Sequence, residues 1–103
     1  MKEISAQELV DIADSATVLD VREVFEYVDG HFPGAISMPL ATVPSRVGEL
    51  DSQKTYHVIC EAGVRSAKAC DFLTANGFDV INVSGGTGLL RMIGTQLNFG
   101  ETA

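Results

Sequence analysis

The chain has 103 residues, of which 46% are hydrophobic and 20% charged, a balance typical of a globular domain rather than of a disordered chain. Its net charge of −7 argues against binding to nucleic acid or to acidic membranes, because both need a basic face. No apolar run approaches the roughly 18 residues of a membrane span, and the N-terminus has no apolar signal core. We therefore expect one domain over residues 1–103, in the cytoplasm, with its two cysteines as free thiols.

The first half of the chain alternates short strands and helices. Residues 2–4 predict an edge strand, and Ser5 with Glu8 forms a capping box that starts a helix ending near Asp14 and Ser15. The β-branched and apolar run over 17–21 predicts a strand that is buried on both faces. The next predicted elements are a short helix over 23–29, a turn-rich loop over 30–34 and a short strand over 35–37.

The second half repeats the alternation. Its predicted elements, in chain order, are a helix over 42–50, a strand over 56–59, a turn from residue 60, a helix ending near Asn76, a strand over 79–83 and a helix over 87–93. Pro44 falls in the first turn of its helix, where a missing N–H costs nothing, and Gly77 suits the left-handed residue that ends a helix. The tail from Gly94 is weakly patterned, and we expect it to be frayed.

Strands that alternate with helices predict an α/β fold, an open and mostly parallel five-stranded sheet with helices on both faces. In such sheets ligands bind outside the carboxyl ends of the strands. The segments that lead to Arg22, Cys60 and Gly85 should end together on that edge. Any site chemistry is therefore expected there.

The stretch Cys60-Glu61-Ala62-Gly63-Val64-Arg65-Ser66 carries the strongest functional signal. It places a thiol between the end of a strand and the start of a helix, where unpaired N–H groups and the helix dipole stabilise an anion. Gly63 permits a positive φ inside the turn. Arg65 adds a favourable charge, whereas Glu61 adds an opposing one that can swing into water. We therefore predict a lowered pKa for Cys60.

Five segments in this order resemble a single-domain rhodanese: Leu19-Asp20-Val21-Arg22-Glu23, Glu26-Tyr27, Gly30-His31-Phe32-Pro33-Gly34-Ala35-Ile36-Ser37-Met38-Pro39-Leu40, the Cys60 to Ser66 loop, and Gly85-Gly86. The resemblance covers about residues 4–94 and implies a rhodanese-like α/β fold. That family consists of sulfurtransferases that carry sulfane sulfur on the loop cysteine as a persulfide. By position, Cys60 would accept the sulfur, and the loop that cradles it and the bound donor would be Glu61, Ala62, Gly63, Val64 and Arg65.

Three polar residues are candidates for support of this loop. Ser66 follows Arg65 directly, and Asp20 and Arg22 sit at the end of a neighbouring predicted strand. Asp20 and Arg22 could brace the loop by hydrogen bonds, or they could form a local ion pair without a role in the chemistry. The sequence leaves these two readings open.

The second cysteine and the histidines suggest no further chemistry. Cys70 falls on an apolar helix face with Leu73, so core packing is favoured over a role as a resolving thiol. Without a C-x-x-C pair, a zinc site at His57 and Cys60 is only a minor alternative. We expect neither a metal nor a cofactor.

Three functions remain open. The first is a sulfurtransferase that moves sulfur from thiosulfate or a persulfide to a thiol, to cyanide or to a sulfur-relay protein. The second is a phosphatase or arsenate reductase, which needs five residues between its cysteine and arginine, whereas four separate Cys60 from Arg65. The third is a non-catalytic or sulfur-sensing module. Within the first, Glu61 and the net charge predict weak use of the dianion thiosulfate.

Overall fold

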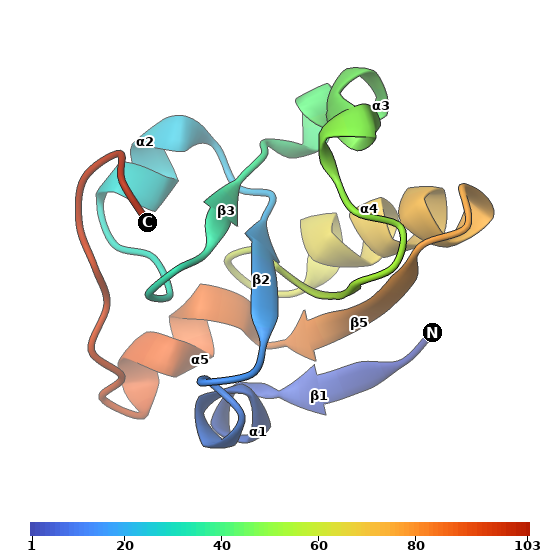
Figure 1. Cartoon of the computed structure of the whole chain (residues 1–103). Coiled ribbons are helices and arrows are strands. Elements are labelled where there is room, and N and C mark those ends of the chain that lie inside the picture. The colour runs from blue at the N-terminus through green and yellow to red at the C-terminus, as the bar shows by residue number, and fades with distance from the viewer.

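The chain folds around a single five-stranded sheet, and the computed structural model describes all 103 residues. The strands are β1 (Glu3–Ser5), β2 (Thr17–Asp20), β3 (Ile36–Ser37), β4 (Thr55–Ile59) and β5 (Asp79–Ser84). They lie in the order β1-β5-β4-β2-β3 (Figure 1), and every neighbouring pair is parallel. The predicted α/β sheet is confirmed, and it is parallel throughout rather than mostly parallel.

Helices cover both faces of the sheet, as predicted. They are α1 (Ala6–Asp11), α2 (Val24–Val28), α3 (Val43–Arg46), α4 (Val64–Ala75) and α5 (Gly86–Met92), with 3₁₀ turns η1 (Leu40–Thr42) and η2 (Val47–Glu49) on either side of α3. None of these helices has the length and apolar character that a membrane crossing requires.

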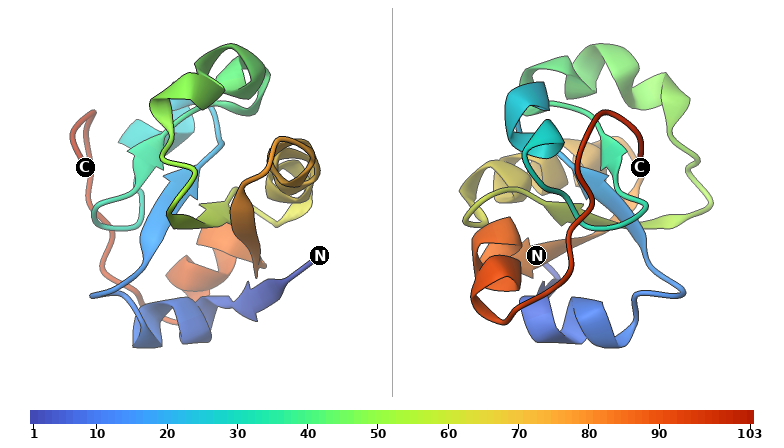
Figure 2. Two further views of the ribbon diagram at one scale, coloured as in Figure 1. Left: turned by 45° about the vertical axis from the view of Figure 1, so that its right-hand side comes forward. Right: turned by 90° about the vertical axis from the view of Figure 1, so that its left-hand side faces the viewer.

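Two buried clusters fill the spaces above and below the sheet. Leu9, Tyr27 and Leu90 bring α1, α2 and α5 into one cluster, and Val43 and Leu73 bring α3 and α4 into the other (Figure 2). Successive strand residues point to opposite faces, so each central strand contributes to both clusters. This two-sided burial explains why the central strands are almost continuously apolar.

Local signals in the sequence set some helix ends better than others. The capping box is confirmed, because the Ser5 hydroxyl accepts the Glu8 N–H at 3.1 Å and the Glu8 carboxylate accepts the Ser5 N–H at 2.9 Å. α1 nevertheless ends at Asp11, and turns follow it. The single helix expected over 42–50 is wrong: it is one turn of α-helix between two 3₁₀ turns. Pro44 lies in the first turn of α3, as expected, whereas Gly48 weakens a continuous α-helix beyond it.

The C-terminal tail is docked, so the expected frayed tail is wrong. His31 and Asn98 exchange backbone hydrogen bonds of 2.8 and 2.9 Å, and the Gly100 N–H donates to the Val28 carbonyl at 2.9 Å. Leu97 packs against the cluster beneath α1, α2 and α5. The red segment in Figure 1 runs from α5 to α2 along this path. These contacts join residues far apart in the chain, which a local pattern does not reveal.

The carboxyl ends of the central strands meet at one edge, as predicted. Asp20 pairs in register with Ile59, the residue before Cys60. β5 ends at Ser84, directly before the Gly85-Gly86 pair. The fold therefore brings the Asp20–Arg22 segment, the Cys60 loop and the Gly85-Gly86 pair to one edge of the sheet.

Replacing Leu97 by alanine should test the docking of the tail. We expect Leu97→Ala to lower the free energy of unfolding by about 1–2 kcal/mol, because a half-buried leucine loses part of its contacts with the core. Met92→Ala is the matched control, since Met92 is 80% exposed and should change stability by less than about 0.5 kcal/mol. Urea unfolding followed by circular dichroism measures both. Equal stability of the two variants would contradict the docked tail.

Candidate active site

The Cys60 thiol is held by the turn that follows it. Its Sγ accepts the Gly63 N–H at 3.0 Å and lies 3.3 Å from the Ser66 hydroxyl. Gly63 has φ of +101° and precedes the first residue of α4. A side chain at this φ is strained, so glycine lets the chain fold back over the sulfur. Cys60 itself is only 1% exposed.

Burial and hydrogen bonding act in opposite directions on the pKa of Cys60. Burial raises it, but hydrogen bonds from the Ser66 hydroxyl and from the N–H groups of Ser66, Gly63 and Ala62 outweigh burial, so the pKa lies below its ordinary value. The predicted direction is confirmed, although the cause is the loop's own donors rather than Arg65. Burial instead raises the pKa of Cys70 to about 11. Both thiols are free, and only Cys60 is poised to ionise.

The start of α5 supports the loop from behind. The Thr87 N–H donates to the Cys60 carbonyl at 2.9 Å, and the Gly88 N–H donates to the Glu61 carbonyl at 3.0 Å. A Cβ added to Gly86 would lie 2.1 Å from the Cys60 oxygen, so only glycine permits this approach. The sequence pattern assigns no role to Thr87 or Gly88, and the adjacent Gly85-Gly86 pair is the only signal that points to them.

Asp20 and Arg22 form a buried ion pair at the same edge. The Arg22 Nε lies 3.0 Å from Asp20 Oδ1, Nη2 lies 2.7 Å from Oδ2, and neither side chain is exposed. Nη2 also donates to the Gly30 carbonyl at 2.8 Å, and Nη1 lies 3.3 Å from Glu61 Oε1. The structure therefore shows the ion pair of one reading and a contact with the loop, as in the other. The residues form a local ion pair, and Arg22 also reaches the loop.

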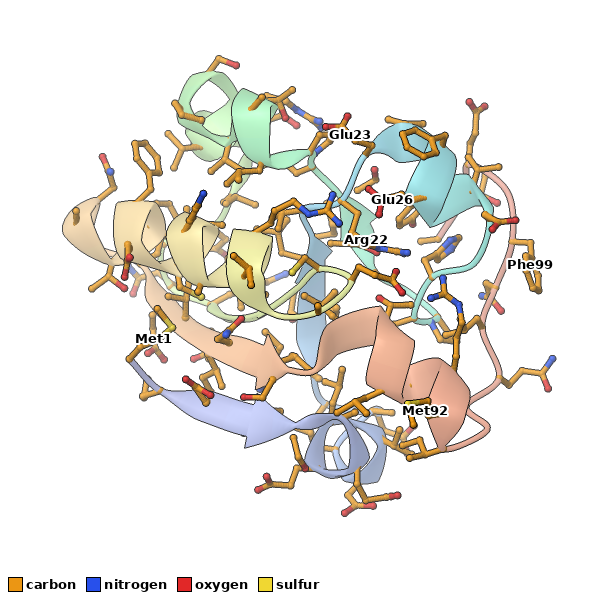
Figure 3. All side chains as sticks on the ribbon, turned by 180° about the vertical axis from the view of Figure 1, so that it is seen from behind. Met1, Arg22, Glu23, Glu26, Met92 and Phe99 are labelled. Atoms are coloured by element: carbon orange, nitrogen blue, oxygen red, sulfur yellow. The ribbon has the colours of Figure 1, made fainter.

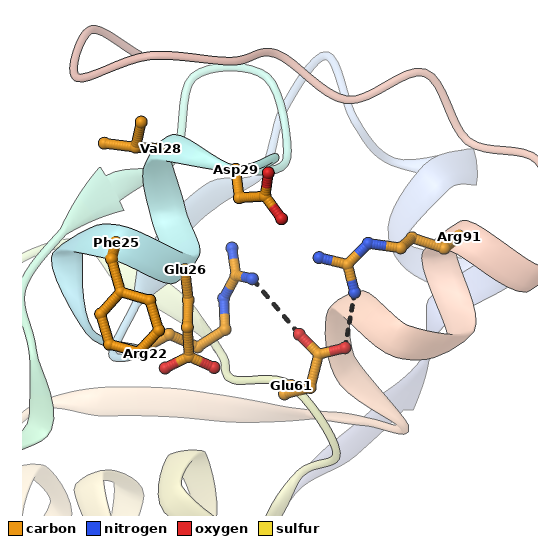
Figure 4. A pocket seen from close by; sticks show the side chains of 7 residues that line it. All are labelled: Arg22, Phe25, Glu26, Val28, Asp29, Glu61 and Arg91. Atoms are coloured by element: carbon orange, nitrogen blue, oxygen red, sulfur yellow. Dashed lines mark hydrogen bonds and ion pairs between the residues drawn. The ribbon is translucent and has the colours of Figure 1, made fainter.

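The carboxylate of Glu61 is paired, so the expectation that it swings freely into water is wrong. One oxygen faces Arg22, and the other accepts from Arg91 Nη1 at 2.5 Å (Figure 4). Glu61 thus ties the loop to the end of β2 and to α5. Arg91 has no signal in the sequence, because its partner lies 30 residues away.

Arg65 is bound to a carboxylate of α2. Its Nη1 and Nη2 lie 2.7 and 3.0 Å from the two oxygens of Glu26. This bidentate contact is the main reason that the pKa of Glu26 falls to about 2. Figure 3 shows the side chain of Glu26, which is a residue of α2, near that of Arg22. The family pattern includes Glu26, but nothing in the sequence pairs it with Arg65.

The remaining loop side chains contribute little to the site. Ala62 is exposed and Val64 is 65% exposed, and of these two residues only Ala62 directs its backbone N–H at the thiol. His57 lies within β4 three positions before Cys60, so strand alternation directs the two side chains to opposite faces of the sheet. The geometry therefore gives no support to the minor zinc alternative.

A cleft of about 510 Å³ opens between α2, the loop and α5. Figure 4 shows its lining, which consists of Arg22, Phe25, Glu26, Val28, Asp29, Glu61 and Arg91. Both arginines in this cleft are bound to carboxylates. The cleft borders the loop, whereas Cys60 is not part of its wall. Chemically, the site offers a thiol of lowered pKa with N–H donors around it, and its arginines are paired with carboxylates.

Residues 5–88 match the family model of the rhodanese-like domain. The chain belongs to the rhodanese family. It is 35% identical over 89 residues to a putative sulfurtransferase, YtwF, of Bacillus subtilis, covering 84% of this chain and 86% of that one. It is also 30% identical to the thiosulfate sulfurtransferase GlpE of Shewanella oneidensis, covering 82% and 87%. A rhodanese-related protein from Thermoplasma volcanium has the same fold, with a TM-score of 0.91 at 34% identity over 95% and 98% of the two chains.

Removal of the Ser66 hydroxyl should raise the pKa of Cys60, because the thiolate loses a hydrogen-bond donor while its burial is unchanged. The measurement is titration of the thiolate by its ultraviolet absorbance, in a Cys70→Ala background that leaves one thiol. Ser45→Ala is the control, since the Ser45 hydroxyl bonds only to the Thr42 carbonyl. An unchanged or lowered pKa in Ser66→Ala would contradict the assigned role of Ser66.

Replacement of Gly86 by alanine should destabilise the fold much more than replacement of Gly34. Both glycines have positive φ, but a Cβ at Gly34 meets nothing within 4 Å. We expect Gly86→Ala to cost at least about 2 kcal/mol more than Gly34→Ala, because the loop backbone must move away from α5. Thermal and urea unfolding of both variants give the difference. Similar losses would show that the tight contact with Cys60 is not needed.

Proposed function

We propose that this chain is a sulfurtransferase that carries sulfane sulfur on Cys60 as a persulfide. One observation carries the proposal: the thiol that occupies the family's sulfur-accepting position has a lowered pKa and accepts hydrogen bonds from its own loop. Relatives named as sulfurtransferases support the same reaction class. The two free cysteines fit action in the cytoplasm, where thiols stay reduced.

The reaction needs no separate base, because the nucleophile is the thiolate itself. The Cys60 thiolate attacks the outer sulfur of the donor, forming a new S–S bond while the donor's S–S bond breaks. The bonding electrons leave with sulfite when the donor is thiosulfate, or with a thiolate when it is a persulfide. The Cys60 persulfide then gives its outer sulfur to cyanide or a thiol, which restores the Cys60 thiolate.

The backbone of the loop supplies the stabilisation. The N–H groups of Ala62, Gly63 and Ser66 that now hold the thiolate would hold the charge of the persulfide. Since Cys60 is 1% exposed, side chains at the mouth of the loop must shift before a donor touches the sulfur. Asp20, Arg22, Glu61 and Ser66 keep the loop in position, as loop supports rather than reacting groups.

Thiosulfate should be a poor donor for this site. It carries two negative charges, and Arg22, Arg65 and Arg91 are all bound to carboxylates. A persulfide carries one charge, which the loop N–H groups can hold. A relative named as a putative sulfur carrier protein, YrkF of Bacillus subtilis, is 41% identical over 75 residues, and this chain spans 40% of it. A sulfur-relay protein is therefore part of our proposal as an acceptor, beside small thiols and cyanide.

Mass spectrometry of the intact protein tests the persulfide. After treatment with cysteine persulfide we expect Cys70→Ser to gain one sulfur atom on Cys60, and subsequent cyanide should remove it as thiocyanate. Cys60→Ser should gain none, because Cys70 has a pKa of about 11 and is buried. Sulfur found on Cys70 alone, or no uptake by the wild type from either persulfide or thiosulfate, would overturn the proposed function.

A further inference from the structure

Arg65 is the only arginine within the loop, and both of its Nη atoms contact one carboxylate. It reaches from the first turn of α4 to Glu26 on α2, with contacts of 2.7 and 3.0 Å to the two carboxylate oxygens. The partners are 39 residues apart in the chain. The pair therefore joins the connection after β2 to the connection after β4, which carries Cys60.

Glu26 is held in place independently of Arg65. Its Oε1 also accepts the Glu23 N–H at 3.0 Å, a contact that caps the N-terminus of α2. The Glu26 side chain is 21% exposed and the Arg65 side chain 35% exposed, so the pair is partly shielded from water. A fixed and partly buried carboxylate is a persistent partner, whereas an exposed one exchanges freely with solvent.

Other cations at this edge are committed or distant. Arg22 is bound to Asp20 and Glu61, and Arg91 is bound to Glu61. Lys68 is exposed and lines a separate cleft on the α4 side of the loop. Arg65 is the cation within the loop itself, and its pKa is raised first by the contact with Glu26 and also by the charge of Cys60, so the charges of Arg65 and the thiol interact.

We propose that Glu26 determines donor specificity by occupying Arg65, which disfavours dianionic donors such as thiosulfate and leaves the site to thiol persulfides. To reach Arg65, thiosulfate must displace Glu26 and leave that carboxylate, whose side chain is only 21% exposed, without its partner. The thiosulfate dianion, the Glu26 carboxylate and the Cys60 thiolate would then compete for one guanidinium. A persulfide avoids this cost, because its single charge lies on the outer sulfur and is held by the loop N–H groups. This inference rests on the sulfurtransferase function proposed above.

Glu26→Gln is the direct test. The amide oxygen of glutamine can still accept the Glu23 N–H, so the cap of α2 is kept while the charge that holds Arg65 is lost. We expect kcat/KM for thiosulfate to rise about tenfold, mainly through a lower KM, and to fall more steeply with salt. With cysteine persulfide as donor, kcat/KM should change by less than about twofold, because that donor does not need Arg65.

Two further variants show whether the effect passes through Arg65. Glu49→Gln makes the same change of net charge and removes the partner of Arg46, an ion pair within the α3 segment. It should leave both donors unaffected. Adding Arg65→Ala to Glu26→Gln should abolish the gain with thiosulfate. Should Glu26→Gln fail to fold, Arg65→Lys serves instead: lysine keeps the charge but cannot bind both oxygens, so thiosulfate use should rise by at least about twofold.

The outcomes separate this inference from the proposed function. If the wild type takes up no sulfur from either donor, the sulfurtransferase function fails. If Glu26→Gln takes up sulfur from the persulfide normally but gains nothing with thiosulfate, the function stands and the role of Glu26 is overturned. An equal gain in Glu49→Gln, or a gain that survives Arg65→Ala, also overturns it, because overall charge would then explain the effect.

Discussion

The hydrogen bonds that the loop backbone makes to the buried Cys60 thiol are the constraint on which the rest of the structure depends. A thiolate removed from water is unfavourable unless donors replace its hydration, and the donors here come from the residues that follow it in the chain. Their convergence needs the positive φ of Gly63, and the loop can take this shape only because Gly86 lets α5 approach the Cys60 carbonyl. Gly63 and Gly86 are thus both needed for the same anion-binding loop.

The charges around the loop are arranged as closed pairs rather than as an open basic pocket. Arg22 lies in the interior with Asp20 and also reaches Glu61, which in turn binds Arg91. Burial of a guanidinium is tolerated because its N–H groups face carboxylates and a carbonyl. The consequence is a well-braced loop whose attraction for anions comes from neutral backbone groups, in a chain with a net charge of −7.

Membership of the rhodanese family supports sulfur transfer as the reaction class, whereas the pairing of the charges underlies the donor preference that we propose. Relatives of similar length include one named for thiosulfate, and they share the fold with this chain at about a third identity. Family membership alone does not select a donor. Under our proposal the Glu26–Arg65 pair bears on this choice, because it occupies the one arginine of the cysteine loop.

By itself, the sequence determined the α/β class, the edge at which the site lies and the cysteine loop, because strand burial, capping boxes and tight turns are encoded by neighbouring residues. Ser5 with Glu8 and Gly77, for example, are local signals that mark the start of α1 and the end of α4. Only the tertiary structure decided the docked tail and the partners of Glu61 and Arg65. Ion pairs across 30 or more residues depend on how the elements pack, and no local pattern specifies which carboxylate meets which arginine.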